Sequence, residues 1–171
     1  MTKKKIFLIV IGVLVAIQLY RPAGRNPEED PSRTVKSSMM MPSDVEHIFT
    51  KSCNDCHSYR TTWPWYSKIA PVSWFIASDV NDGRRHLNFS DWGRYTPERV
   101  QNKLGEICDE VEHGEMPLKQ YTWLHKGTSL SENERQAVCF WTKMEQARIT
   151  KMTGVKVPER PKGGMHAEDK K

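Results

Sequence analysis

Apolar residues recur at helical spacing through the middle of this chain. In the segment 71–82 they occupy positions 72, 75, 76 and 80, which predicts a helix that ends at Gly83. Thr96 and Pro97 are typical of a helix start, and the apolar positions 100, 104, 107 and 111 predict a second helix, which ends at Gly114. No segment alternates convincingly between apolar and polar residues, so the pattern indicates an all-α protein.

Two capping boxes mark the starts of two further helices. Ser43 followed by Glu46 predicts a short helix that runs towards Lys51. Ser131 followed by Glu134 predicts the last helix, in which the apolar positions 137, 138, 141 and 144 continue the helical spacing. We therefore expect residues 43–150 to form one domain of about four helices joined by long connections.

The N-terminus carries the features of an export signal. Lys3 to Lys5 precede the run from Ile6 to Ile17, whose twelve residues have no polar side chain. Basic residues before a short apolar core are typical of secretory sequences. The run is shorter than the roughly 20 residues of an ordinary spanning helix. However, no Ala-x-Ala-like cleavage site follows it.

These features favour an uncleaved anchor over residues 1–20, a single-pass transmembrane helix in a bacterial inner membrane. The rest of the chain would then face the periplasm. Cleavage of the segment, which would leave a soluble periplasmic protein, is the alternative. Residues 21–42, rich in proline and charge, are expected to form a linker, and residues 151–171 a disordered tail.

The composition excludes several classes of protein. With 171 residues and a mean hydropathy of −0.67, the chain is too small for two large lobes and too polar for a multi-span membrane protein. The formal charge is +5, but four of the 26 basic residues flank the apolar N-terminal run. The remainder is nearly neutral, so no nucleic-acid partner is expected.

The motif CNDCH at residues 53–57 is the part of the sequence that predicts a cofactor site. C-x-x-C-H is the attachment signature of c-type haem, in which two thiols join the vinyl groups of one haem and the histidine binds the iron. A thioredoxin-like motif would need a βαβ context, and a zinc site would need four ligands, whereas the other two cysteines stand alone. The motif predicts one covalent haem c, attached to Cys53 and Cys56, with His57 as the proximal ligand.

The iron needs a sixth ligand or an open site. Met116 is the best candidate for the distal ligand, because it stands in a polar loop after a helix and beside a proline. A side chain that fills a gap in the core is the other interpretation of Met116. The alternative ligands are three histidines: His86, His113 and His125. The other ring nitrogen of His57 is expected to donate to a backbone carbonyl, for which that of Pro71 is a candidate.

Cys108 and Cys139 are the remaining cysteines. In an oxidising compartment such a pair often forms a disulfide. Their helical positions make a bridge awkward, because Cys139 lies nearly opposite the apolar stripe of its helix and bridged Cα atoms must lie within about 7 Å. The spacing of these residues therefore allows either a disulfide or two free thiols.

The stretch from about Ser38 to Arg148 resembles the small bacterial proteins grouped as a haem-binding domain of the c-type cytochrome kind. Four runs carry the resemblance: CNDCHSYRTTWPWYSKIAPVSW from Cys53, DVNDGRRHLNFSDW from Asp79, GEMPLKQYTWLH from Gly114, and ERQAVCFW ending at Trp141. Gly127 and Thr128 depart from the acidic–alanine pair that is usual in the family, which affects a turn and no ligand.

The resemblance implies an all-α, cytochrome-c-like domain around one covalently attached haem. It implies that Cys53, Cys56 and His57 hold this haem, and it supports Met116 as the distal ligand. Cysteines recur in the family at the positions of Cys108 and Cys139, which supports a disulfide between them. The resemblance does not supply a partner.

We interpret the chain as a membrane-anchored, single-haem c-type cytochrome that transfers electrons on the periplasmic side. It is not expected to be an enzyme, and its partners would be redox proteins of unknown identity and, through the anchor, the membrane. The alternative is a haem-based redox or gas sensor, or a peroxidase-like enzyme, with an open sixth position. A protein in which haem is only structural is a third class.

Overall fold

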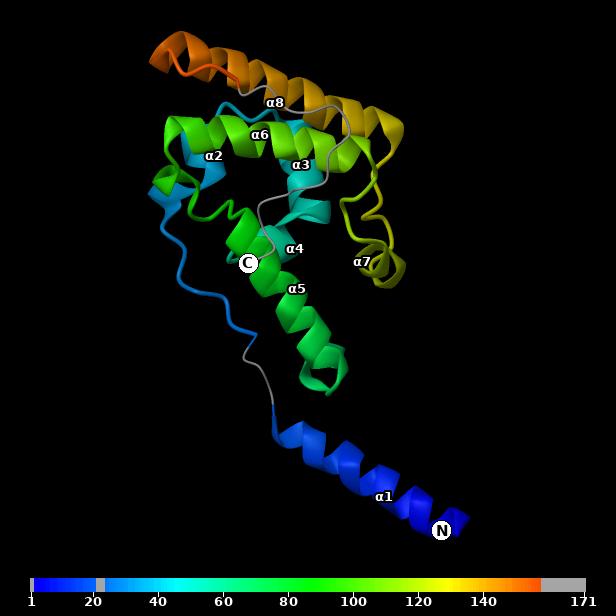
Figure 1. The fold of residues 1–171 in the computed structure, drawn as a ribbon. Helices are drawn as coiled ribbons and strands as arrows, with labels where there is room; N and C mark the ends of the chain where they lie inside the picture. The colour runs from blue at the N-terminus through cyan, green and yellow to red at the C-terminus, as the bar shows by residue number, and fades with distance from the viewer. Residues whose placement is uncertain (1, 21–23, 158–171) are drawn as a thin grey trace.

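The computed structural model describes residues 2–20 and 24–157, and every regular element in these ranges is a helix (Figure 1). The α-helices are α1 (Lys3–Ala16), α2 (Val35–Ser38), α3 (Ser43–Ser52), α4 (Asn54–His57), α5 (Val72–His86), α6 (Pro97–Glu112), α7 (Lys119–Leu124) and α8 (Glu132–Thr153). The short 3-10 helices are η1 (Ile17–Leu19), η2 (Pro31–Arg33), η3 (Trp65–Lys68) and η4 (Trp92–Arg94). The predicted all-α fold is confirmed.

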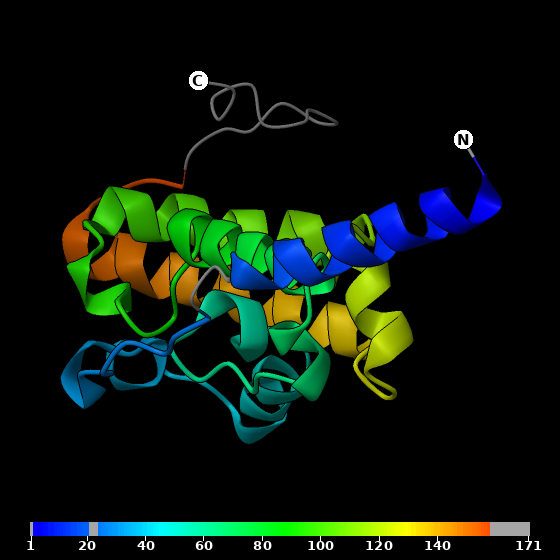
Figure 2. The same cartoon turned by 90° about the horizontal axis from the view of Figure 1, so that it is seen from below.

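The two longest helices, α6 and α8, lie side by side and form one wall of the domain (Figures 1 and 2). Leu104 of α6 is fully buried, and Val138 of α8 is only 1% exposed. Helix α3 packs against α8, where the rings of Phe49 and Trp141 meet edge to face at 5.3 Å. Burial of such side chains is the main force that holds the helices together.

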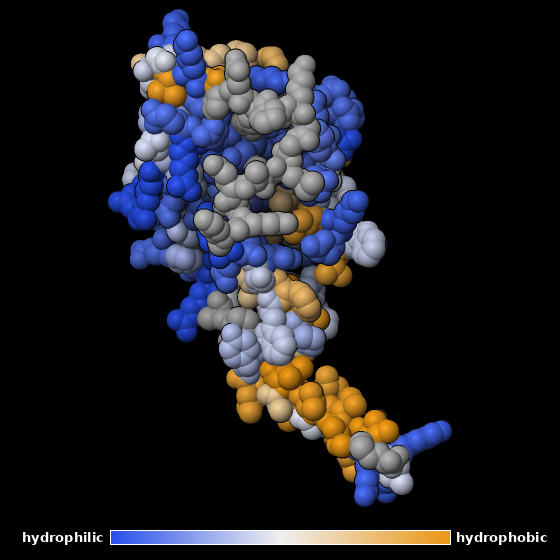
Figure 3. All heavy atoms as spheres, viewed as in Figure 1, coloured by the Kyte–Doolittle hydropathy of each residue, from blue (hydrophilic) through white to orange (hydrophobic). Residues whose placement is uncertain are grey.

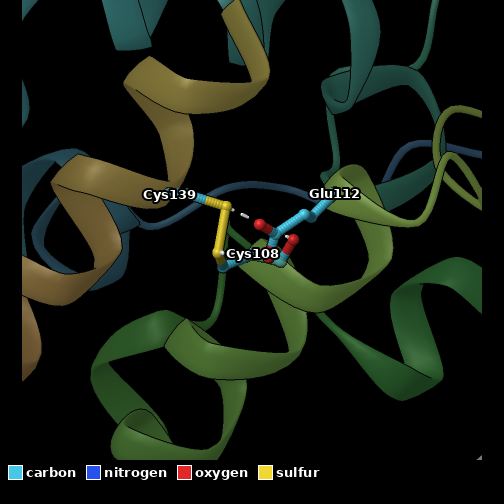
Figure 4. A group of neighbouring side chains, drawn as sticks. All are labelled: Cys108, Glu112 and Cys139. Carbon is cyan, nitrogen blue, oxygen red and sulfur yellow. Dashed lines mark hydrogen bonds between the residues drawn. A yellow bond between two sulfur atoms is a disulfide. The ribbon is translucent and has the colours of Figure 1, made fainter. Parts of the chain in front are cut away.

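A disulfide between Cys108 and Cys139 joins α6 to α8 (Figure 4). The two Cα atoms lie 4.6 Å apart, and both residues are buried. Cys139 reaches Cys108 although it lies away from the apolar stripe of α8, because α6 packs closely along that side. The carboxylate of Glu112, one turn further along α6, lies 3.9 Å from the Cys108 sulfur.

The predicted starts of α6 and α8 are confirmed. The Thr96 side chain accepts a hydrogen bond from the backbone N–H of Arg99 at 3.3 Å, which caps α6. Ser131 and Glu134 form the complete capping box of α8. Gly114, with a φ of 72°, turns the chain after α6, a left-handed conformation that favours glycine.

Helix α3 (Ser43–Ser52) forms as predicted, but its capping box and the predicted end of α5 are wrong. Helix α3 begins at Ser43, but no side chain caps it, and the Glu46 carboxylate accepts a hydrogen bond from Lys36 of α2 at 2.5 Å instead. Helix α5 continues through Gly83 to His86 rather than ending at the glycine. In both cases the residue concerned meets another element: Glu46 bonds Lys36 of α2, and Gly83 lies against Cys56 of α4.

The segment expected to be a linker packs on the domain over residues 24–42. Val35 lies in the core, and its backbone N–H donates to the carbonyl of Phe89 at 2.7 Å. The Glu29 carboxylate accepts hydrogen bonds from the Ser90 hydroxyl at 2.5 Å and from Arg60 at 2.8 Å. Long-range contacts thus make this proline-rich stretch part of the fold.

The expected tail begins inside the domain. Helix α8 runs to Thr153, and the Val155 carbonyl accepts a hydrogen bond from the Gln101 side chain at 3.3 Å. Residues 158–171 of the expected tail lie outside the described residues.

The predicted membrane anchor is wrong. Within residues 2–20 and 24–157, no helix is both long and apolar enough to cross a membrane. Helix α1 has 14 residues. It would span about 21 Å, against about 30 Å for the hydrocarbon core of a bilayer. The single-pass inner-membrane location, with the domain facing the periplasm, depended on this anchor and is withdrawn with it.

Helix α1 is nevertheless apolar and attached to the domain at its C-terminal end. Its side chains are exposed, and Figure 3 shows them as an apolar surface beside the largely polar domain. The Gln18 amide, just after the helix, bonds both the N–H and the carbonyl of Ala70, each at 3.0 Å. The Tyr20 carbonyl accepts a hydrogen bond from the Trp74 indole at 2.8 Å.

The ion pair between Lys51 and Glu134 gives a prediction on stability and pH. The Lys51 ammonium lies 2.5 Å from Glu134, and this hydrogen bond, helped by those from Ser131, lowers the pKa of Glu134 to about 2. A carboxylate with a lowered pKa stabilises the fold above its ordinary pKa, and the stabilisation is lost as pH falls towards about 2. We expect Glu134→Gln to lower the free energy of unfolding by about 1 kcal/mol at pH 7.

Urea denaturation of both proteins at pH 7 and at steps below pH 4.5 measures this effect. The difference between them should shrink as pH falls from about 4.5 towards 2. Glu46→Gln is the control, since the Lys36–Glu46 pair is more exposed and caps no helix, so little change is expected. A Glu134 variant as stable as the parent at pH 7 would contradict the prediction.

Candidate functional site

The CNDCH motif forms a single helical turn, α4, directly after α3. The backbone N–H groups of Cys56 and His57 donate to the carbonyl of Cys53 at 3.2 and 3.0 Å. The hydroxyl of Ser52 donates to the carbonyl of Thr128 at 2.8 Å, which fixes the end of α3 against the loop before α8. The fold therefore presents both cysteines and the histidine from one tethered turn.

Cys53 and Cys56 are free thiols in half-buried positions. Burial raises the pKa of the Cys53 thiol to about 12. Burial, with the neighbouring carboxylates of Asp55 and Asp79, raises the pKa of Cys56 to about 11. Both pKa values therefore favour the thiol over the thiolate at neutral pH in the haem-free chain.

The ring of His57 is oriented by two backbone carbonyls. Its Nδ1 lies 3.0 Å from the carbonyl oxygen of Gly83 and 3.1 Å from that of Leu87. Carbonyls only accept hydrogen bonds, so Nδ1 carries the proton and Nε2 carries the lone pair. Burial lowers the pKa of His57, which favours the neutral ring that metals bind. The prediction that the Pro71 carbonyl is the partner of His57 is wrong. That carbonyl accepts a hydrogen bond from the backbone N–H of Trp74 instead.

Gly83 allows α5 to lie directly against the motif. A Cβ atom at this position would stand 2.6 Å from the carbonyl oxygen of Cys56 and 3.1 Å from its Cβ. No side chain fits in that space, so glycine is needed here for close packing rather than for a turn. The same approach brings the Gly83 carbonyl to the ring of His57.

Met116 lies in the loop between α6 and α7, half-buried against the hydrophobic core. Its backbone N–H donates to the carbonyl of Glu110 at 3.1 Å, so the loop folds back on the end of α6. Cys53 packs against the same core. The structure thus places Met116 and the motif around one core, and whether Met116 binds iron stays a prediction.

Helix α7 lies next to the motif, a contact that the sequence did not reveal. Cys56 lines a cleft together with residues of α5, α7 and the loop 61–66. The Tyr121 hydroxyl of α7 donates to the Asp55 carboxylate at 2.8 Å. Burial and this hydrogen bond raise the pKa of Tyr121. The only signal in the sequence was the position of Asp55 inside the motif.

The three alternative histidines have other contacts. His86 Nδ1 lies 2.8 Å from the carbonyl of Asp82, and His113 Nδ1 lies 2.7 Å from that of Asp109. His125 has both ring nitrogens engaged, Nδ1 with the Tyr121 carbonyl at 3.0 Å and Nε2 with the Tyr66 hydroxyl at 3.3 Å. These contacts suit structural roles.

Comparison with known families decides the identity of the cofactor. A family model described as a haem-binding domain matches residues 12–144, most of the chain, including the motif. The chain belongs to this haem-binding domain family. Haem is therefore its cofactor. No curated protein and no solved structure matches this member of the family.

The motif residues of this haem-binding domain fit a haem by their chemistry. Two free thiols, separated by two residues, lie in one helical turn. His57 beside them is neutral, with Nε2 as the nitrogen that carries the lone pair. This is the donor set that a covalently attached haem requires.

Proposed function

We propose that this haem-binding domain carries one haem c on Cys53 and Cys56 and acts as an electron carrier. When bound, the haem supplies one-electron exchange between Fe(II) and Fe(III). The observation that carries the proposal is the state of His57. Two carbonyls accept the hydrogen bond of its Nδ1–H group, which leaves the lone pair on Nε2 for a metal, and two free thiols lie in the same turn.

Attachment would use the thiols as the structure holds them. Cys53 and Cys56 would hold the haem through two thioether bonds, each made by addition of one S–H group across one vinyl group. Both thiols are free in this structure, so each is available for such a bond.

Met116 would be the distal ligand of an electron carrier. Its thioether favours the reduced iron, and its backbone is held by the carbonyl of Glu110. An enzyme would need an acid–base group on the distal side, but His113 is exposed and bonded to Asp109, and His125 has both nitrogens engaged. On this proposal the protein transforms no substrate and exchanges electrons with redox partner proteins.

Absorption spectra of the full chain, produced in a host that matures c-type cytochromes, test the proposal. Spectra are recorded oxidised, reduced, and reduced with carbon monoxide. We expect a covalent, low-spin haem that does not respond to carbon monoxide. A high-spin haem, or ready binding of carbon monoxide, would reject the carrier in favour of a sensor or an enzyme. A chain without covalent haem would reject haem c itself.

Replacement of the distal ligand gives a second test. Met116→Ala should turn the haem high-spin, allow one carbon monoxide to bind per reduced haem, and lower the reduction potential. Met41→Ala is the matched control, because Met41 is another half-buried methionine against the same core. If Met116→Ala keeps the low-spin spectrum of the parent, then Met116 is not the ligand.

A further inference from the structure

One carboxylate inside the motif holds two other parts of the chain. Asp55 Oδ2 accepts the hydrogen bond from the Tyr121 hydroxyl at 2.8 Å. Asp55 Oδ1 accepts a second hydrogen bond, from the backbone N–H of Thr62, also at 2.8 Å. Since Tyr121 belongs to α7 and Thr62 to the loop after the motif, the carboxylate joins both to the turn that bears the cysteines.

Helix α7 begins three residues after Met116, so the Asp55–Tyr121 contact lies at one end of the Met116 loop. The other end is fixed on α6, where the N–H groups of Glu115 and Met116 donate to the carbonyl of Glu110 at 3.0 and 3.1 Å. Helix α6 is itself joined to α8 by the disulfide. The segment 116–121 is therefore anchored at both ends, on α6 through the backbone of Met116 and on the motif through Tyr121.

We infer that Tyr121 is a positioning residue, whose hydrogen bond to Asp55 fixes residues 116–124 against the motif and keeps Met116 at the iron. The role of Met116 rests on the proposed function, whereas the attachment of α7 to the motif does not. A hydrogen bond to a charged acceptor is among the stronger ones in proteins, so its loss is expected to open the loop measurably.

The test removes one oxygen atom. In Tyr121→Phe the ring keeps its stacking on His125, whose centroid lies 4.3 Å away, but the hydrogen bond to Asp55 is lost. Tyr66→Phe is the matched control, because it removes a hydroxyl that contacts His125 in the same region and leaves Asp55 untouched. Both variants are prepared as full chains with haem attached.

Carbon monoxide binding and the absorption band of the iron–thioether bond report on Met116. We expect Tyr121→Phe to keep covalent haem, to bind carbon monoxide about tenfold faster than the parent, and to show a weaker thioether band. Tyr66→Phe should match the parent. Equal carbon monoxide binding in Tyr121→Phe and the parent would overturn the inference.

Hydrogen exchange of the haem-free full chain keeps the two proposals distinguishable. The amides of residues 117–124 should exchange about tenfold faster in Tyr121→Phe and at the parental rate in Tyr66→Phe. Unchanged exchange would overturn the inference whatever the haem does, including the case in which Tyr121→Phe fails to retain haem. A third outcome separates the two proposals. If the parent shows no iron–thioether bond but exchange is still faster in Tyr121→Phe, then Met116 is not the ligand, whereas Tyr121 does fix α7 to the motif.

Discussion

The double variant Cys53→Ser/Cys56→Ser is expected to carry no covalently bound haem. A serine hydroxyl does not replace a thiol in addition to a vinyl group, and the structure offers these two as the free cysteines. The variant should still fold, because neither side chain makes a bond that joins two helices, whereas Cys108 and Cys139 do. Denaturing gel electrophoresis with haem staining, and the mass of the intact chain, measure the loss.

Cys108→Ser/Cys139→Ser is the matched control for that experiment. It also replaces two cysteine sulfur atoms by oxygen but leaves the motif intact. The folded fraction should therefore keep one covalent haem per chain. Loss of the disulfide should lower its free energy of unfolding by about 3 kcal/mol, so attachment is counted per folded molecule. Covalent haem in the Cys53→Ser/Cys56→Ser variant would contradict the attachment site.

Gly83→Ala is expected to damage both the fold and the haem site. In an open helix this change stabilises by about 1 kcal/mol. Here the new Cβ would meet the Cys56 carbonyl oxygen at 2.6 Å, and backbone atoms cannot rotate away as a side chain can. Separation of α5 from α4 would also pull the Gly83 carbonyl from His57. We expect a loss of about 2 kcal/mol in the free energy of unfolding, with a lower yield of haem-bearing protein.

Urea denaturation of the haem-free chain and the haem content per molecule measure the two effects separately. Gly12→Ala in α1 is the control, because a Cβ at Gly12 meets no atom within 4 Å. That change should raise the free energy of unfolding by at most about 1 kcal/mol and leave the haem content at its parental value. If Gly83→Ala proves as stable as the parent, the close packing of α5 on the motif is not required.

Local patterns predicted much of the fold, but they failed where a distant contact overrides them. The glycine at position 83 reads as a helix stop, yet α5 continues to His86, and the glycine lies against Cys56 of the motif. The pair Ser43 and Glu46 reads as a capping box, yet Glu46 bonds Lys36 of another helix. The run from Ile6 to Ile17 reads as an anchor, yet the helix that forms is too short to span a membrane.

The sequence by itself determined the all-helical class, the caps of α6 and α8, and the motif chemistry. These features depend on residues within a few positions of one another, so the spacing along the chain encodes them directly. The tertiary structure alone decided which carbonyls orient His57 and the hydrogen bond from Tyr121 to Asp55, 66 positions away, and it settled the disulfide that the helical positions had left open. Such contacts depend on how helices pack, which no local pattern contains.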